Sequence, residues 1–384
     1  MSARVKFAGF SLIEMMIALV IGLLLLLGVI QVFSASRTAL QLSEGASRAQ
    51  ENGRFALDFL ARDIRMAGHF GCVNDQAHFV KGEGDPRVNL SAATGSGNPL
   101  DFSVSIQGYE ATGTAPGGRI QIGGTLAAAT GVPSQIQSLN PAPLPGSDIL
   151  VLRYLSAEGV PVTGIVRSGS ASVVSVNGAR WSRLTSGGVG APSLFGIADC
   201  SHADVFTGTS AAGSVTASVD LSRYTAQPTG QTMLYRAESL VYYVGSGTSG
   251  EPSLRRARAD STGAYTQNED LVEGVESLQL LYGLDATVDI SRGTPPAGNI
   301  TSHVVASGLT APANAAGANQ WRRVGEVQVG IVARSPSAAA AGATASDDPL
   351  GVLGVSVLPP ATPDGRYRAS YELSVALRNR LFGN

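Results

Sequence analysis

The sequence predicts an α+β protein in which one long N-terminal helix packs on a large, mainly antiparallel β domain. Three observations lead to this prediction. Residues 15–33 contain no charged residue and no proline, which is typical of a membrane-spanning helix. Residues 38–67 also lack proline and repeat small and apolar residues every three or four positions, as an amphipathic helix does. From residue 148 onward, short runs rich in β-branched residues alternate with glycine- and serine-rich segments, which indicates strands and loops.

The composition limits the classes of function. The chain has 384 residues, enough for one large or two ordinary domains, and a formal net charge of −2. This balance gives no global attraction to nucleic acid, so no nucleic-acid partner is expected. Only 15% of the residues are charged and 47 are glycine, which favours an exported, loop-rich β domain over a cytosolic helical enzyme.

The first element is a basic leader, residues 1–9, followed by an apolar run over residues 10–33. Arg4 and Lys6 are the only charges in the leader, so the positive-inside rule leaves the N-terminus in the cytoplasm and the body outside. The apolar run gives ~36 Å of helix, enough to span a bilayer. Glu14 is its only acid. Because a carboxylate there costs about 2.5–3.5 kcal/mol on insertion scales, Glu14 is a candidate functional residue.

Two other interpretations of this segment compete with a retained membrane helix of special function. A cleavable export signal is one, since Ser34-Ala35-Ser36 is small enough to resemble its cleavage site. A plain membrane anchor is the other. Against the signal, the apolar run is longer than the roughly 7–15 residues of a signal core, and Glu14 has no role in a discarded segment.

The helix is predicted to continue over residues 10–68, with Gly68 as its stop. The apolar positions are Leu42, Ala46, Ala49, Ala56, Leu60 and Ile64, and the charge pairs four apart are Glu44/Arg48, Arg54/Asp58 and Asp58/Arg62. Gly53 is a weak point in the middle of this pattern. The outer half needs a partner for its apolar face, and the C-terminal sheet of the same chain is the expected one.

The body, residues 69–384, is predicted to be rich in strands. The segments are 148–154, 162–167, 172–176, 214–220, 233–244, 253–258, 275–282, 324–334 and 367–377. Alternation of apolar and polar residues is clearest in the last two. The insert over residues 78–145 is predicted to hold loops with minor strands, and the alanine-rich stretch 335–346 an exposed loop.

The run Gly9-Phe10-Ser11-Leu12-Ile13-Glu14, with its basic leader and apolar continuation, resembles the processing site of type IV prepilins and type II secretion pseudopilins. The resemblance implies cleavage after Gly9 by a prepilin peptidase and N-methylation of the new terminal residue, Phe10. Cleavage leaves a positive amine on Phe10, which Glu14 of a neighbouring subunit can neutralise. In a low dielectric this pairing offsets the cost of burying either charge, and it would set the axial register of a filament.

Further motifs in the body are similar to those of PilW-type minor pilins. They are Arg65-Met66-Ala67-Gly68 with Cys72, Asp199-Cys200-Ser201 with Phe206, Met233–Arg236, Leu271–Glu276 running into Tyr282-Gly283, Trp321–Val324 before a strand ending in Arg334-Ser335, and Val375–Arg380. The resemblance implies a pilin-like fold, with residues 10–33 in the inner membrane or filament core and the body in the periplasm.

This resemblance also implies a set of partners and a non-enzymatic role. The partners are other minor pilins, the major pilin, the prepilin peptidase, the inner-membrane assembly platform and a tip adhesin. The implied role is to join a minor-pilin complex that primes pilus assembly, at or near the tip, and so supports twitching motility. A J-type pseudopilin of type II secretion and a pilus-tip adhesin remain the alternatives.

The two cysteines, Cys72 and Cys200, are predicted to form a disulfide, because the body would lie in an oxidising compartment. The bridge would close a loop of ~130 residues, worth roughly 4–5 kcal/mol in the chain-entropy model. Two unpaired thiols are one alternative. A zinc site formed with His69 and His202 is another, since the spacings are near those of metal ligands.

No catalytic residue, cofactor site or metal site is predicted. Residues 245–250 match the G-x-G-x-x-G pattern, but a turn and a strand follow instead of a helix, so a hairpin loop is expected. Asp285, Asp289 and the pair Asp347-Asp348 lack the spacing of a calcium loop and are expected in solvated turns. The basic cluster over residues 255–258 is expected to be a solvated strand edge or a partner contact.

Overall fold

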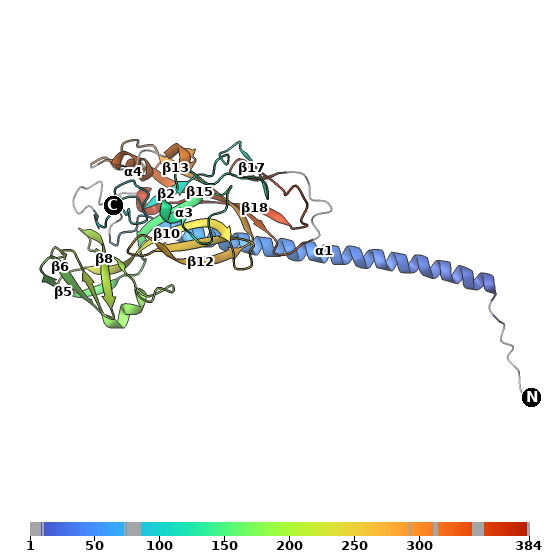
Figure 1. Ribbon diagram of the computed structural model, residues 1–384, viewed down its shortest axis with the longest axis horizontal. Coiled ribbons are helices and arrows are strands. Elements are labelled where there is room, and N and C mark those ends of the chain that lie inside the picture. The colour runs from blue at the N-terminus through green and yellow to red at the C-terminus, as the bar shows by residue number, and fades with distance from the viewer. Residues whose placement is uncertain are drawn as a thin grey trace, which may run out of the picture.

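The structure is a computed structural model that describes residues 9, 11–72, 74, 86–291, 293–309, 314–339 and 349–381. Phe10, His78 and the pair Asp347-Asp348 lie outside the described residues, as do most of the leader and part of the alanine-rich stretch. The described chain has the expected α+β layout, with one long N-terminal helix and a large, mostly antiparallel β body (Figure 1).

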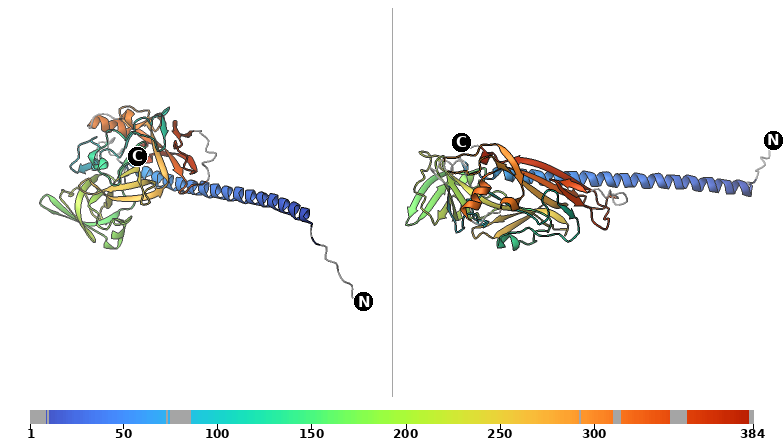
Figure 2. Two further views of the ribbon diagram at one scale, coloured as in Figure 1. Left: turned by 45° about the vertical axis from the view of Figure 1, so that its right-hand side comes forward. Right: turned by 90° about the horizontal axis from the view of Figure 1, so that it is seen from above.

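The long helix, α1, spans Leu12–Met66 and has 55 residues. Its N-terminal half projects from the body as a nearly straight rod (Figures 1 and 2), and every residue from 12 to 44 is exposed. By length and composition α1 can cross a membrane. On its surface Arg54 pairs with Asp58 at 4.0 Å, as predicted, whereas Arg48 pairs with Glu51 instead of Glu44.

Both ends of α1 lie slightly inside the predicted range of 10–68. Ser11 has extended backbone angles (φ −69°, ψ 141°), so the first helical residue is Leu12. At the other end Ala67 leaves the helical region (φ −52°, ψ 128°), one residue before the predicted stop at Gly68, whose φ is +78°. The helix pattern therefore gave the element correctly and its ends to within two residues, which is normal for terminal turns.

In the residues that the structure describes, the body contains eighteen strands and a few short helices. The strands are β1 (Arg87–Asn89), β2 (Ile106–Tyr109), β3 (Arg119–Gln121), β4 (Ile149–Leu155), β5 (Val160–Ser168), β6 (Ala171–Val176), β7 (Leu194–Ala198), β8 (Ala203–Ala211), β9 (Ser214–Ala217), β10 (Met233–Ser246), β11 (Pro252–Ala259), β12 (Tyr265–Glu273), β13 (Val275–Asp285), β14 (Ile300–Val304), β15 (Val324–Arg334), β16 (Leu350–Val352), β17 (Val355–Leu358) and β18 (Arg368–Ala376). The helical turns are α3 (Ser134–Gln137), η1 (Gly178–Arg183), η2 (Ala306–Leu309), α4 (Ala315–Arg322) and α5 (Arg378–Leu381).

These strands form three sheets. The largest has eleven strands, with the order β1-β8-β9-β6-β5-β10-β11-β12, and β2, β4 and β7 join it beside β10 and β8. The second has the order β14-β13-β15-β18, and the third is the small sheet β16-β17-β3. All pairings are antiparallel except β1 with β8 and β17 with β3.

The second half of α1 is built into the main core, between the large sheet and the second sheet. Leu60 and Ile64 are fully buried there against residues of both sheets, such as Leu240 in β10 and Val329 in β15. A separate core lies under β5, β6, β8 and β9, at the end of the body furthest from the N-terminus (Figures 1 and 2, green). The packing of α1 on the C-terminal sheet agrees with the sequence-based expectation.

Each of the nine predicted strand segments contains a strand, and residues 324–334 match β15 at both ends. The segment 214–220 is shorter than predicted, since β9 ends at Ala217. β2 and β3 are minor strands of the kind predicted within the insert, and the sequence pattern missed β1, β7, β8, β12, β14, β16 and β17. Several of these are only three or four residues long, and β12 is polar because its side chains face arginines of β11.

Candidate functional site

The first candidate site is the start of α1, where Ser11 and Glu14 form a reciprocal cap. The backbone N–H of Ile13 donates to the Ser11 hydroxyl at 3.4 Å, and the backbone N–H of Ser11 donates to Glu14 Oε2 at 3.0 Å. This is the capping box, which satisfies N–H groups that have no partner inside the helix. The S-x-x-E spacing in the sequence is the signature of such a cap, so Glu14 has a role within the chain in addition to the expected role between subunits.

Glu14 is the only charged residue between residues 12 and 33, the apolar part of the helix. The large side chains that follow it, from Met15 to Phe33, are each about half to three-quarters exposed. Such a surface needs lipid or other helices around it. Gly9 is exposed and non-helical immediately before this segment. The arrangement places a flexible-backbone glycine, a helix cap and a lone carboxylate within six residues.

The second candidate site is the junction between the body and α1, where the body first packs against the helix. Gly45 is the first residue of α1 that the body buries, and a side-chain carbon added there would collide with Ala339 Cβ. At Gly53 an added Cβ would lie 2.5 Å from Cδ2 of Tyr371 in β18. The helix therefore uses glycine at both positions because neighbouring side chains approach too closely for a larger residue. Gly53, predicted to be a weak point of the helix, is the position at which Tyr371 packs against α1.

Asn52, which lies between these two glycines in the sequence, adds a polar contact to the junction. Asn52 Nδ2 donates to the carbonyl oxygen of Glu273 at 2.9 Å. The adjacent Gly274 receives a bond from the N–H of Arg334 and donates its own to Pro252 O, each at 2.8 Å. The motif Leu271–Glu276, which carries part of the resemblance to PilW-type pilins, thus supplies a backbone acceptor to the contact with the helix.

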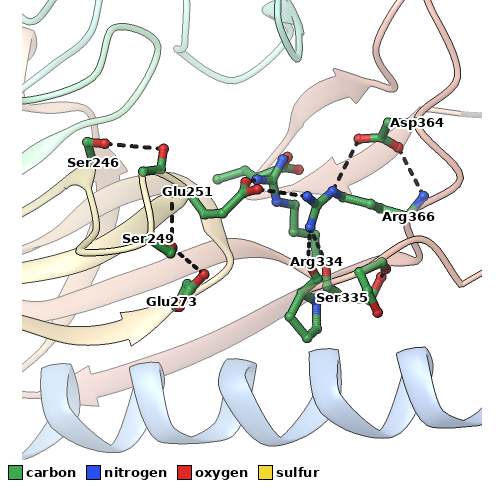
Figure 3. Close-up of polar contacts among 12 residues, drawn as sticks. Ser246, Ser249, Glu251, Glu273, Arg334, Ser335, Asp364 and Arg366 are labelled. Carbon is green, nitrogen blue, oxygen red and sulfur yellow. Dashed lines mark hydrogen bonds and ion pairs between the residues drawn. The ribbon is translucent and has the colours of Figure 1, made fainter.

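Around this segment lies a network of six charged side chains, which we call the junction network. Its members are Glu251, Glu276, Arg334, Asp364, Arg366 and Arg368 (Figure 3). Arg334 contacts Glu251 and lies 2.6 Å from Glu276 Oε1. Arg366 Nη2 lies 2.8 Å from Glu251 Oε1, and Arg368 Nε lies 2.6 Å from Glu276 Oε2. The three arginines and three acids balance in charge.

The charges and the burial of the junction network shift the pKa of two of its members, Asp364 and Arg334. Hydrogen bonds from Arg368, opposed by partial burial, lower the pKa of Asp364 to about 2. Burial, together with the nearby Arg366 and Arg368 charges, lowers the pKa of Arg334 to about 10. Arg334 therefore remains charged at neutral pH. The network joins the β10–β11 hairpin, β13, β15 and the segment before β18.

A third set of contacts fixes the end of α1. Asp63 is buried; its Oδ2 accepts a hydrogen bond from the Tyr242 hydroxyl at 2.5 Å and lies 3.1 Å from Arg256 Nη1. Arg256 also pairs with Glu269. This corrects the expectation of a solvated basic edge at residues 255–258, because β11 lies between β10 and β12 and its arginines are bound by acids of the neighbouring elements.

Cys72 and Cys200 form a disulfide that joins the chain just after α1 to the β7–β8 turn. His69 Nδ1 instead lies 2.9 Å from Leu155 O, and burial lowers the pKa of this histidine. In the part of the chain that the structure describes, no three His, Cys, Asp or Glu side chains are placed to hold a metal. The residues of the alternative zinc site are therefore used in other contacts.

The remaining candidates have structural roles in the described residues. Residues 245–250 belong to the hairpin between β10 and β11, as predicted. Asp285 is buried and accepts three backbone N–H groups, from Thr287, Ala297 and Gly298, which corrects the expectation of a solvated turn. Asp289 is exposed, as expected for a solvated turn. Beside the arginine cluster, Asn268 Nδ2 donates a hydrogen bond to the Tyr243 hydroxyl.

Comparison with known families agrees with these sites. The model of the prokaryotic N-terminal methylation motif matches residues 4–30, which include Gly9, Ser11 and Glu14. The model described as type IV pilus-assembly protein W matches residues 241–379, which include every member of the junction network. Neither family consists of enzymes; both describe pilus components. No curated protein and no solved structure matches the chain. The two family matches, together with the long apolar helix and the β body, support a type IV pilin of the PilW type.

Proposed function

We propose that this chain is a minor pilin that joins other minor pilins in a complex that primes pilus assembly and stays at or near the tip. Its partners would be the major pilin, the prepilin peptidase, the inner-membrane assembly platform and a tip adhesin. Residues 1–9 would be removed, residues 10–33 would first span the inner membrane, and residues 69–384 would form the periplasmic body. The observation that carries the proposal is the lone Glu14 carboxylate at the start of an exposed apolar helix.

The proposed sequence of events follows from charge. Cleavage after Gly9 creates an amine on Phe10, four residues before Glu14. Within one chain Glu14 already accepts the Ser11 N–H, so its second oxygen remains to receive the amine of a neighbouring subunit. In the apolar surroundings of packed helices this pairing would be strong, because neither charge has water to stabilise it. Pairing would therefore select the axial position at which a subunit enters the filament.

The test separates the charge of Glu14 from its capping role. Glu14→Gln keeps an oxygen acceptor for the Ser11 N–H but removes the charge, whereas Ser11→Ala removes the capping hydroxyl and keeps the charge. We expect Glu14→Gln, like Glu14→Ala, to be cleaved normally yet to be depleted from sheared pili. Ser11→Ala should be incorporated. Asp58→Asn, an exposed acid further along α1, is the matched control.

Cells that lack the protein should carry few surface pili, and the wild-type gene should restore them. Normal incorporation of Glu14→Gln would contradict the proposed register role. Recovery of the protein only with a secretion complex, and never in sheared pili, would support the type II pseudopilin alternative. The match to the pilus-assembly family over residues 241–379 favours the pilus over that alternative.

A further inference from the structure

We propose that the segment 335–339, held in place by Arg366, is a clasp that fixes the direction in which α1 leaves the body, and that this direction is required for incorporation into pili. The inference rests on the proposed function, in which the free half of α1 packs among other helices. It makes Arg366 and Gly45 positioning residues, although neither lies in the processing motif. We call residues 335–339 the clasp segment.

The clasp segment contacts α1 at the point where the helix leaves the body. Residues 12–44 are exposed and Gly45 is the first buried residue. The side chain of Ala339 fills the space beside Gly45, where any added side chain would collide with it, and Ala339 is only 2% exposed. Ser335 Cβ approaches from the other end of the segment. The helix and the clasp segment therefore touch closely at Gly45, whereas a groove lined by Arg48 of α1 and Ser337 of the clasp segment lies beside this contact.

Arg366 holds the clasp segment from the side opposite α1. Its Nη1 donates to the carbonyl oxygens of Ser335, at 3.0 Å, and of Pro336, while its Nη2 pairs with Glu251 (Figure 3). Backbone bonds secure both ends: Ser335 N–H donates to Tyr367 O at 2.8 Å, and Ala339 N–H donates to Gly365 O at 2.7 Å. A planar guanidinium suits this task, because it can donate to several acceptors in a fixed geometry.

Because the clasp contacts α1 far from its N-terminus, a small change in tilt at the clasp would displace the start of the helix by a large distance. The free segment of α1, residues 12–44, is roughly 50 Å long at 1.5 Å per residue. A tilt of about 10° at Gly45 would move the start of the helix sideways by about 9 Å, which is about the distance between the axes of two packed helices. Glu14 and the amine of a neighbouring subunit must approach to within a few ångströms to pair. A contact that restricts tilt at Gly45 therefore keeps Glu14 within reach of its partner.

Arg366 can be removed without dismantling the body around it. Arg334 and Arg368 would still pair with Glu276, and the cores under α1 do not include Arg366. The side chain acts on the clasp segment and on Glu251, both near the surface. Arg366→Ala should therefore release the restraint on α1 while the body stays folded. This result differs from that of a variant whose body unfolds.

The experiment measures the restraint and the incorporation separately. Spin labels on cysteines introduced at Ala39 in α1 and Thr301 in β14, both exposed, report the distance between helix and body in the full chain in detergent micelles. We expect a narrow distance distribution for the parent protein and at least a twofold broader one for Arg366→Ala and Gly45→Leu. Arg54→Ala, an exposed arginine of α1, is the control and should leave the distribution narrow.

The same variants are then expressed in cells and measured in sheared pili. We expect normal cleavage but several-fold less Arg366→Ala in pili, with partial recovery for Arg366→Lys. A parent distribution as broad as that of Arg366→Ala would overturn the clasp, as would Arg366→Ala incorporated at the parent level. Failure of the proposed function is distinguishable, because normal incorporation of Glu14→Gln would refute the register role while the distance measurement still tests the clasp.

Discussion

The carboxylate of Asp63, near the end of α1, lies 3.1 Å from the guanidinium of Arg256 in β11. The same oxygen accepts the hydroxyl of Tyr242 in β10, so one helix residue joins two adjacent strands of the large sheet. Burial, together with the nearby Asp63 charge, raises the pKa of Tyr242 well above its usual value. The Tyr242 hydroxyl therefore keeps its proton at neutral pH and can donate it to Asp63.

Replacement of Asp63 by alanine should destabilise the body strongly. It would leave a buried hydroxyl and a largely buried guanidinium without a partner on α1. We expect a loss of about 3 kcal/mol in the free energy of unfolding, the lower end for breaking a buried pair, because Arg256 keeps Glu269. Denaturant unfolding followed by tryptophan fluorescence measures it. Asp58→Ala, exposed on the same helix, should change stability by less than about 0.5 kcal/mol, and equal losses for the two variants would refute the role of Asp63.

Gly53 should be intolerant of larger residues because of Tyr371. Alanine is worth about 1 kcal/mol over glycine inside a helix, yet its Cβ would lie 2.5 Å from the Tyr371 ring. We expect Gly53→Ala to destabilise the body by about 1–3 kcal/mol through overpacking. In the background Tyr371→Ala, the same change should become neutral or stabilising. A double-mutant cycle from four unfolding curves checks this, and additive effects would show that the two residues do not contact.

Two buried carboxyls, Glu110 and Asp148, should contribute a loss of stability as the pH rises above the unfolded pKa of about 4. The Thr114 hydroxyl lies 3.0 Å from Glu110 Oε1 and 3.4 Å from Asp148 Oδ1. Burial raises the pKa of both acids, and the Glu110 charge raises that of Asp148 further. A raised folded-state pKa gives stability that is fully present below the unfolded value of about 4 and is lost as the pH rises through the folded value.

The variant Glu110→Gln should therefore flatten this pH dependence. It removes one charge from the pair and keeps an oxygen acceptor for Thr114. We expect the unfolding midpoint to drop less between pH 5 and pH 8 than in the parent protein. Asp289→Asn, which changes an exposed acid, is the control. A Glu110→Gln protein with the same pH dependence as the parent protein would contradict the assignment.

Removal of the disulfide should loosen the region between α1 and the β7–β8 turn. Cys72 and Cys200 are 128 residues apart, so the bridge restricts a long loop in the unfolded chain. We expect Cys72→Ser to lower stability by about 2–5 kcal/mol. Cys200→Ser and the double variant should show the same loss, since each removes the same bond. Thiol titration of the denatured chain supplies the check, and two free thiols in the parent protein would disprove the bridge.

Local patterns in the sequence were sufficient for α1 and for the longer strands. The charge-free run and the small-residue spacing predicted one helix, and alternation in residues 324–334 predicted β15 with its correct ends. β12 was missed because its polar side chains pair with arginines of β11, and such compensation shows only when the neighbouring strand is known. The same reason explains the wrong expectation of a solvated edge at residues 255–258.

The two candidate sites differ in how much of each could be predicted from the sequence. Gly9 and Glu14 lie in one short motif, so their importance could be inferred from spacing and apolar context. The junction network joins Glu251, Glu276, Arg334 and Arg366, which lie far apart along the chain and meet only through sheet topology. Gly45 and Gly53 likewise read as weak helix positions. Their value lies in the side chains that pack against them, which sequence alone does not specify.

The central claim is that this PilW-type pilin is processed after Gly9 and delivered to pili. Its most direct test is the intact mass of the protein recovered from membranes and from sheared pili, with fragmentation to read the N-terminus. The account predicts a chain that starts at N-methylated Phe10, lacks two hydrogens for the Cys72–Cys200 bridge, and occurs in pili at low abundance. A chain that retains Met1, or one that starts after Ala35, would contradict it.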